Sequence, residues 1–280
     1  MAVRSLALGF LFAGGCAVYA AAPAIAATPA DIHGARQAAP PAGAEYLSYT
    51  GTAMAGDATQ FLYGERHVLE FRGGRLAARV VLYTCRDGSP FARKLVAYVD
   101  SLAPDFALTD TANGMREGIR TGAGGRTVYF QADGKTPMQT GRLPPVPGLV
   151  ADAGFDEFVQ THWQDLTGRR TLRMRFLLPS RLADDGFQVR YLRSTRIDAT
   201  PVDVFRLRLS GAWGWFLPGI DVSYAASGDH VLMRYDGLSD LADAQGNNFK
   251  AVISFPLRDR RPSDAAAMQA AQHAPLAPCK

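Results

Sequence analysis

The stretch that decides the fold is Phe61-Leu62-Tyr63-Gly64-Glu65-Arg66-His67-Val68-Leu69-Glu70-Phe71. Every second residue of an extended strand points to the same side, so the odd-numbered residues share one largely apolar face. Gly73-Gly74 follows as a two-residue turn, and a second apolar run extends from Leu76 to Thr84. Two such runs joined by a short glycine turn predict a β-hairpin.

The same alternation recurs through the rest of the chain. Leu172, Met174, Phe176 and Leu178 alternate with two arginines, and Phe205 to Leu209 repeats the pattern. Runs of strands without regular β-α-β alternation indicate antiparallel pairing, and one-sided strands indicate a sheet with one face on the core. We therefore expect a mainly β protein with one large, curved, half-barrel-like antiparallel sheet.

One segment, at about 152–166, has helical rather than strand periodicity. Asp152 can cap its first turn, and Gly168 follows its last. Apolar and aromatic residues recur there at spacings of three and four, namely Phe155, Phe158, Val159, His162, Trp163 and Leu166. This amphipathic helix is predicted to pack on the concave face of the sheet.

The N-terminal residues 1–26 have the features of an export signal. Arg4 precedes an apolar run from Leu6 to Phe12, and Ala24-Ile25-Ala26 fits a cleavage site. This pattern predicts secretion to the periplasm of a Gram-negative envelope. A lipobox-like sequence before Cys16 leaves an alternative, in which Cys16 is lipidated and anchors the chain.

The remaining chain divides by composition. Residues 27–44 are rich in alanine, proline and glycine and predict a flexible leader. Residues 45–257 are expected to form a single β-rich domain, and residues 258–280 a short marginal helix or a loose C-terminal tail.

Cleavage after residue 26 leaves Cys85 and Cys279 as the cysteines of the mature chain. An even number of cysteines in an oxidising compartment permits a disulfide between them. The alternative is a buried Cys85 with a free Cys279 on the tail.

Composition and motifs exclude several classes of function. The formal net charge is +4 and the basic residues are scattered, which is not typical of nucleic-acid binding. No later segment is apolar for the length of a membrane span. The histidines and cysteines lack metal-ligand spacing, and no nucleophile motif is present. The sequence therefore predicts no metal, no cofactor and no catalytic residue, and it favours a protein that is not an enzyme.

Glu65 and His67 form the main candidate site because they lie on the apolar side of their strand beside Tyr63. A buried carboxylate and imidazole need polar partners. They can hydrogen-bond each other structurally, anchor a ligand head group, or act as a general base with its orienting partner. With Phe158 and Trp163 of the helix, these three residues are our predicted ligand-binding set.

Three segments together resemble an uncharacterised bacterial cell-envelope family: residues 61–67, residues 154–159 and residues 235–241. More distantly, the chain resembles the half-barrel of the lipoprotein localisation factors A and B. That resemblance implies an apolar cavity between sheet and helix that holds acyl chains. The chain departs from those factors in having one clear helix and a longer C-terminal half.

These observations lead to one main hypothesis and two alternatives. The main hypothesis is a non-enzymatic binder of a lipid or another apolar envelope molecule. The first alternative is an assembly module without a cavity, which docks envelope proteins through an arginine band that includes Arg173, Arg175, Arg206 and Arg208. The second is a hydrolase that uses Glu65 and His67.

Overall fold

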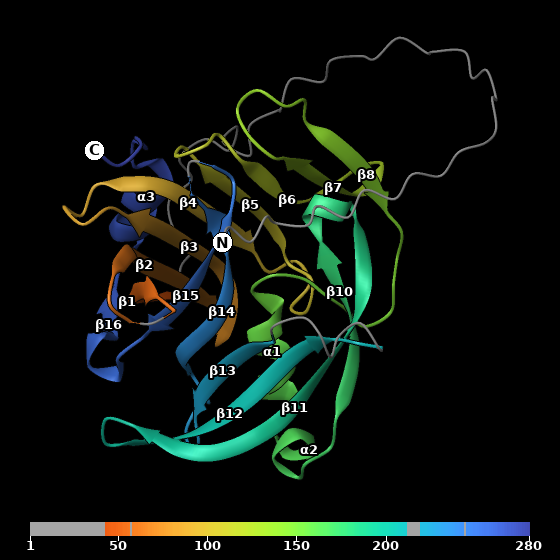
Figure 1. Cartoon of the computed structure of the whole chain (residues 1–280), viewed down its shortest axis with the longest axis vertical. Coiled ribbons are helices and arrows are strands. Elements are labelled where there is room, and N and C mark those ends of the chain that lie inside the picture. The colour runs from red at the N-terminus through yellow and green to blue at the C-terminus, as the bar shows by residue number, and fades with distance from the viewer. Residues whose placement is uncertain (1–42, 57, 212–218, 244) are drawn as a thin grey trace, which may run out of the picture. The chain divides into compact units, whose positions relative to one another are not determined.

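The computed structural model describes residues 43–56, 58–211, 219–243 and 245–280. The predicted signal, Cys16 and almost all of the predicted leader lie outside these residues. The described chain forms one curved sheet of 16 strands, which are antiparallel except for the pair β9–β10 (Figure 1). The predicted fold class is therefore confirmed.

Most strands that are neighbours in the sheet are also consecutive in the sequence, and β1 pairs with β15 where the two halves of the chain meet. In space the hydrogen-bonded path runs β8-β7-β6-β5-β4-β3-β2-β1-β15-β14-β13-β12-β11-β10-β9, and β16 pairs with β1. The strands are β1 (Ala44–Ala55), β2 (Phe61–Arg72), β3 (Arg75–Thr84), β4 (Pro90–Ala97), β5 (Asp105–Asp110), β6 (Arg116–Gly122), β7 (Gly125–Gln131), β8 (Gln139–Leu143), β9 (Leu149–Val150), β10 (Leu172–Leu178), β11 (Ala183–Ile197), β12 (Thr200–Leu209), β13 (Ile220–Ala225), β14 (Leu232–Ala242), β15 (Asn248–Ser254) and β16 (Arg261–Ser263).

The two ends of this sheet meet through side chains. Leu177 of β10 packs with Ile119 of β6 and Val128 of β7 in one buried cluster. Gly141 of β8 lies so close to Leu182 that an added Cβ would stand 3.2 Å from the Leu182 Cβ. We call this junction of β6–β8 with β10 and the following turn η2 (Pro179–Arg181) the seam.

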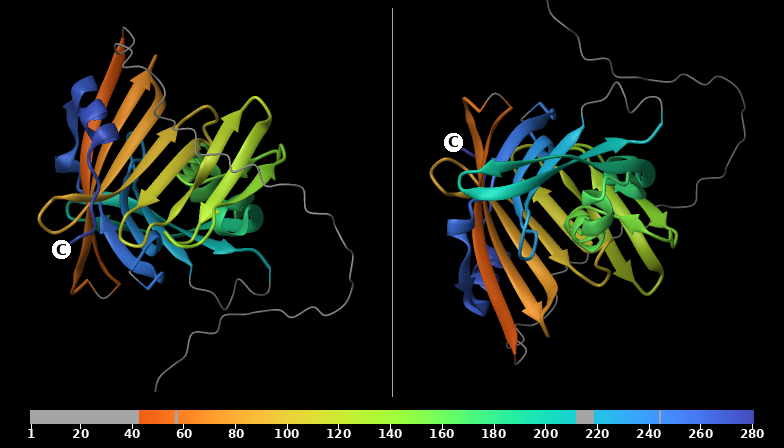
Figure 2. Two further views of the ribbon diagram at one scale, coloured as in Figure 1. Left: turned by 90° about the horizontal axis from the view of Figure 1, so that it is seen from above. Right: turned by 90° about the horizontal axis from the view of Figure 1, so that it is seen from below.

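The predicted helix is present as two short helices, α1 (Gly154–Thr161) and α2 (Trp163–Thr167), which join at His162. Their apolar residues pack on β10–β13, so the helices lie on the concave side of the sheet, as expected (Figures 1 and 2). The predicted cap was wrong: Ala153 precedes the first turn without a side-chain cap. Asp152 instead has a φ of 45° and its carboxylate binds Lys94.

Of the two alternatives for residues 258–280, the structure shows a helix and not a loose tail. This segment contains β16 and helix α3 (Ala265–His273), whose first turn is capped by Asp264 through the Ala267 amide at 2.8 Å. Met268 and Ala271 are buried against Val68, Val80 and Leu82. Those residues point away from the concave face, so α3 covers the outer side of the sheet (Figure 2).

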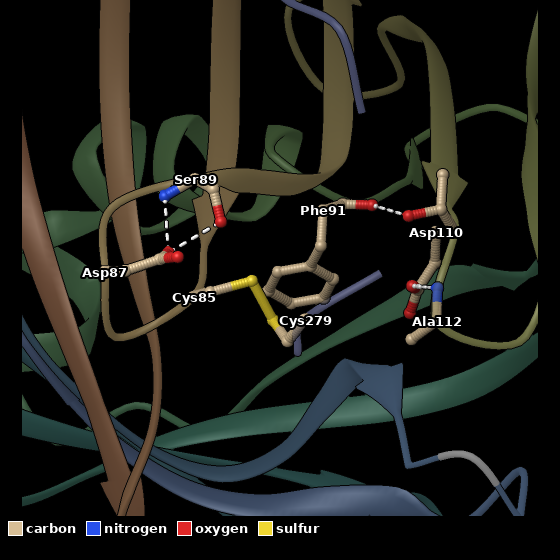
Figure 3. Close-up of a disulfide and its surroundings, with 8 residues drawn as sticks. Cys85, Asp87, Ser89, Phe91, Asp110, Ala112 and Cys279 are labelled. Atoms are coloured by element: carbon tan, nitrogen blue, oxygen red, sulfur yellow. Dashed lines mark hydrogen bonds between the residues drawn. A yellow bond between two sulfur atoms is a disulfide. The ribbon is translucent and has the colours of Figure 1, made fainter. Parts of the chain in front are cut away.

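Beyond α3 the chain is joined to the sheet by a disulfide. Cys279 Sγ is bonded to Cys85 Sγ across 194 residues of sequence (Figure 3). The Ala277 amide also donates to the Pro90 carbonyl at 3.1 Å. No helix within the described residues is long and apolar enough to cross a membrane.

Candidate functional site

The concave side of the sheet encloses a cavity of about 1150 Å³. Its wall takes residues from β2 to β7, from β10 to β15 and from the turn before α1. Much of the wall is apolar or aromatic, including Val81, Val96, Phe106, Met115, Phe130, Phe155, Phe176, Phe187, Leu207, Val222, Leu232 and Ile253. A cavity of this size with a largely apolar wall is suited to an apolar guest.

Three of the five predicted ligand-binding residues line this cavity, and they come from β2. Tyr63, Glu65 and His67 are all buried, and Glu65 Oε2 lies 2.7 Å from His67 Nε2. Phe158 and Trp163 are buried elsewhere, between the helices and β10–β13. The Trp163 ring stacks on His230 with centroids 3.7 Å apart, and packs edge-on against Phe205. Their side chains thus hold the helices in place behind the cavity wall.

His67 is held as a neutral ring. Burial lowers the pKa of His67, and this effect outweighs the opposing hydrogen bond and charge of Glu65. The ring stacks on Tyr49 at a centroid distance of 4.3 Å and meets Phe255 edge-on. Its Nδ1 atom has no hydrogen-bond partner among the described residues. One polar atom of the imidazole is therefore buried without a hydrogen bond.

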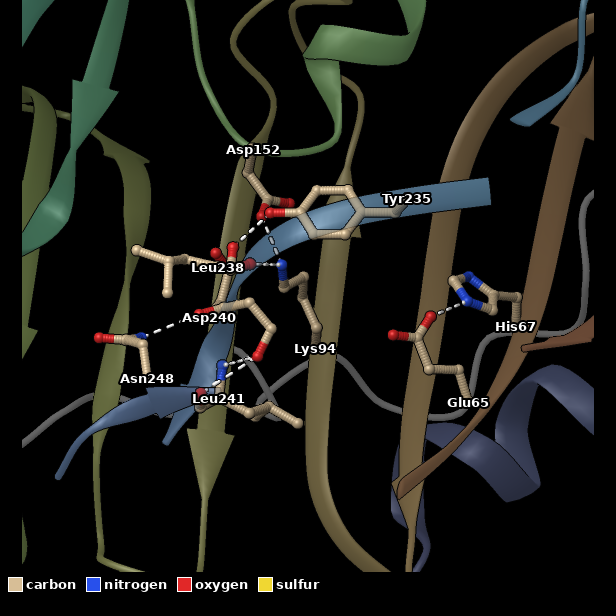
Figure 4. A network of polar contacts seen from close by, with 10 residues as sticks. Glu65, His67, Lys94, Asp152, Tyr235, Leu238, Asp240, Leu241 and Asn248 are labelled. Atoms are coloured by element: carbon tan, nitrogen blue, oxygen red, sulfur yellow. Dashed lines mark hydrogen bonds and ion pairs between the residues drawn. The ribbon is translucent and has the colours of Figure 1, made fainter. Parts of the chain in front are cut away.

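A second polar group lies around Lys94 in the middle of β4 (Figure 4). The Lys94 ammonium binds both the Asp152 carboxylate, on the turn before α1, and the Asp240 carboxylate of β14, the latter at 2.6 Å. Burial alone lowers the pKa of Lys94, but the two carboxylates raise it well above its ordinary value. Lys94 therefore remains charged inside the cavity wall, and we call Lys94, Asp152, Asp240 and nearby Glu117 the Lys94 cluster.

A third polar group connects β3 to the helix. The Arg79 guanidinium lies 3.3 Å from Asp156 of α1, and the Tyr224 hydroxyl donates to the same carboxylate at 2.9 Å. All three residues line the cavity. This group fixes α1 against both halves of the sheet and closes the wall at that point.

Sequence reasoning missed the Lys94 and Arg79 groups, although a usable pattern was present. Lys94 lies between Ala92 and Val96, and Arg79 lies two residues before Val81, so both occupy the apolar side of their strands. A charged residue on an inward face is the same feature that identified Glu65 and His67. Asp152 was interpreted as a helix cap, and Asp240 was not assigned to a site.

Two arginines of the band, Arg175 and Arg206, are paired with carboxylates. Arg175 binds the Asp184 carboxylate, and Arg206 binds Asp221 with Nε–Oδ1 and Nη2–Oδ2 distances of 2.5 and 2.6 Å. These two arginines are thus partly neutralised by neighbouring carboxylates. This pairing weakens the case for the band as a docking surface for acidic partners.

No family model and no curated protein matches this chain. Solved structures with a similar fold include a beta-barrel-like protein of the domain of unknown function DUF1849 from Brucella abortus, with 11% identity, 79% of this chain and 98% of that chain covered, and a TM-score of 0.43. A putative outer membrane lipoprotein-sorting protein domain from Vibrio parahaemolyticus is 10% identical, with 81% and 88% covered and a TM-score of 0.30. A DUF1329 family protein from Desulfovibrio piger is 8% identical, with 82% and 90% covered and a TM-score of 0.27. These neighbours include both kinds of protein that the sequence resembles, an uncharacterised domain and a lipoprotein-sorting domain.

Proposed function

We propose that this protein binds a lipid or another apolar envelope molecule inside the curved sheet and does not catalyse a reaction. The observation that carries the proposal is the cavity of about 1150 Å³ with its largely apolar wall. Ligand pockets usually enclose roughly 300–1,000 Å³, so this volume suits a guest larger than a typical metabolite. Buried polar groups within an apolar wall fix the orientation of a guest that also has a polar part.

The export signal predicted at 1–26 supports a location where such molecules are abundant. The disulfide between Cys85 and Cys279 is consistent with an oxidising compartment. We therefore place the proposed activity in the periplasm, with a lipid anchor at Cys16 as the alternative form of the mature chain.

Both alternative functions are less well supported. An assembly module without a cavity predicts a filled interior, whereas this sheet encloses a large cavity. A hydrolase based on Glu65 and His67 needs a nucleophile or a substrate proton beside the imidazole. Within the described part of the chain, His67 Nε2 lies against Glu65 and Nδ1 has no hydrogen-bond partner, so no hydroxyl or thiol is oriented by the ring.

Native mass spectrometry of the gently purified protein, followed by solvent extraction, tests the proposal. We expect a bound apolar molecule on the native protein and a smaller bound fraction in Leu232→Trp, because the larger ring fills space from the cavity wall. Leu257→Trp is the matched control, since Leu257 is 38% exposed and lies outside that wall.

The proposal is wrong if the wild-type protein carries no guest, and takes up none from added lipid vesicles, while both variants remain folded. Equal guest content in Leu232→Trp and Leu257→Trp would place the bound molecule outside the cavity.

A further inference from the structure

We propose that the cavity selects an amphiphile with a cationic amine group, and that the Lys94 cluster binds this group. The inference rests on the proposed function, because it specifies the chemistry of the guest in the same cavity. It is carried by the charges of the wall, by a buried carboxylate oxygen without an N–H donor and by the aromatic side chains around them.

The cavity wall is acidic although the whole chain is basic. Among the described residues the wall contains six acidic side chains, Glu65, Glu117, Asp133, Asp152, Asp156 and Asp240, and three basic ones, Arg79, Lys94 and Lys135. The chain as a whole carries a formal charge of +4. Glu117 is largely protonated at pH 7, since its pKa is raised to about 8, so five acidic side chains remain against three basic ones. The wall therefore favours a positive guest and opposes a negative one.

Three of the acidic side chains belong to the Lys94 cluster, around one ammonium group. The single Lys94 ammonium is shared by Asp152 and Asp240, and Glu117 of β6 faces the same group. Asp152 Oδ2 is buried on a side chain that is only 9% exposed, and none of the described N–H groups donates to it. The carboxyl groups of Asp152 and Asp240 are close enough to hydrogen-bond each other; burial raises the pKa of Asp152, whereas for Asp240 the effect of burial is outweighed by the Lys94 charge, which lowers the pKa. A buried acceptor without a donor costs free energy. An amine N–H group of the guest can supply that donor.

The surroundings favour an organic cation. None of the described residues forms a group of three histidine, cysteine or acidic side chains arranged to hold a metal ion. Tyr83 and Tyr235 line the cavity near the cluster, and Tyr235 donates its hydroxyl proton to the Leu238 carbonyl. Aromatic faces beside carboxylates are a typical environment for a bound ammonium group.

Glu117 provides a signature that a purely apolar guest would not produce. Burial, together with the charges of Asp240 and Asp152, raises the pKa of Glu117 to about 8, while Lys94 opposes this rise. The charge of Glu117 also acts on Tyr129 of β7, which pairs with Gly118 and so lies on the opposite face of the sheet. Tyr129 is neutral near pH 7, because burial raises its pKa to about 12. An ammonium beside Glu117 favours its ionised form, so binding at pH 7 releases a proton.

The test compares two amphiphiles with the same chain, dodecylammonium and dodecanoate, titrated calorimetrically into the delipidated mature protein below their micellar concentrations. We expect dodecylammonium to bind about tenfold or more tightly, since an anion would meet uncompensated like charges. Titrations in buffers with different ionisation enthalpies should show proton release for dodecylammonium, and this release should be lost in Glu117→Gln.

Asp240→Asn should reduce the preference for dodecylammonium severalfold, and Asp236→Asn on the same strand is the matched control, because Asp236 lies outside the cavity wall. Equal binding of the two amphiphiles, or tighter binding of dodecanoate, would overturn the inference and leave the proposed function intact. If neither amphiphile nor uncharged dodecanol binds, the proposed function fails as well.

Discussion

At the scale of single residues, Lys94 should contribute strongly to stability through the charges that it neutralises. Its side chain is 8% exposed and it binds two carboxylates, of which Asp152 is nearly as buried. Removing one partner of a buried ion pair leaves an uncompensated charge, so Lys94→Met should lower the free energy of unfolding by about 3 kcal/mol. Urea denaturation followed by circular dichroism measures this loss.

Two further variants separate the charge effect from lost packing. The double variant Lys94→Met with Asp152→Asn should lose less stability than the sum of the losses in the two single variants. The reason is that Asp152→Asn removes the carboxylate charge that Lys94→Met leaves without a partner. Lys135→Met is the control, since Lys135 is exposed at the cavity rim and its loss should cost less than about 0.5 kcal/mol. A cost at Lys135 equal to that at Lys94 would contradict our account.

Glu117 should make stability depend on pH. Burial and neighbouring carboxylates raise its pKa from 4.5 to about 8, so between these values the folded chain holds a proton that the unfolded chain has released. Stability therefore falls as pH rises through this window. Glu117→Gln should flatten that fall, and the urea midpoint measured from pH 5 to 9 checks it. Glu45→Gln, at an exposed position on β1, should leave the slope unchanged.

At the scale of elements, α3 should act as a structural part of the sheet. Met268 is buried against Val68 and Val80 on the outer face. A buried methionine cut back to alanine leaves a cavity, so Met268→Ala should cost about 2–3 kcal/mol. Gln269→Ala, next to it on the exposed side of the helix, is the control and should cost little. Equal effects in the urea midpoint would mean that α3 is not packed as described.

Local patterns predicted strands well and the ends of elements poorly. The alternation from Phe61 to Phe71 corresponds to β2, because a strand with one buried face must alternate. For α3 the sequence left a short helix and a loose tail open, because its alanine-rich stretch has a weak apolar stripe. Its burial depends on Val68 and Val80, which are distant in sequence. The helix at 152–166 was predicted as continuous, since periodicity does not reveal the break at His162.

At the scale of the whole molecule, the disulfide between Cys85 and Cys279 should stabilise the fold through the long loop that it closes. Its loss in Cys85→Ser or Cys279→Ser should cost about 2–5 kcal/mol. The double variant should cost no more than either single one, because the same bond is lost in each. Urea denaturation of the variants, beside the wild type with and without reductant, checks this prediction. Unchanged stability on reduction would contradict it.

The cavity is a property of the whole chain and could be anticipated only in part. The alternation of side chains along β2 was enough to predict that Glu65 and His67 point inward, because it depends on one strand only. The Lys94 cluster needs β4, β6, β14 and the turn before α1 to meet. The order of the strands in the sheet decides whether these elements come together, and the alternation of side chains along a strand does not reveal that order. For this reason the acidic character of the wall is visible only in the folded molecule.

The cavity wall is held together differently at the seam than in the rest of the sheet. Elsewhere around the curve, neighbouring strands are joined by ladder hydrogen bonds, whereas at the seam β6 and β7 meet β10 through side chains such as Ile119, Val128 and Leu177. Parting apolar side chains costs about 25 cal/mol for each Å² exposed to water, and this cost rises smoothly with area. We therefore expect a bulkier guest to part the wall first along this line, while the rest of the sheet keeps its register.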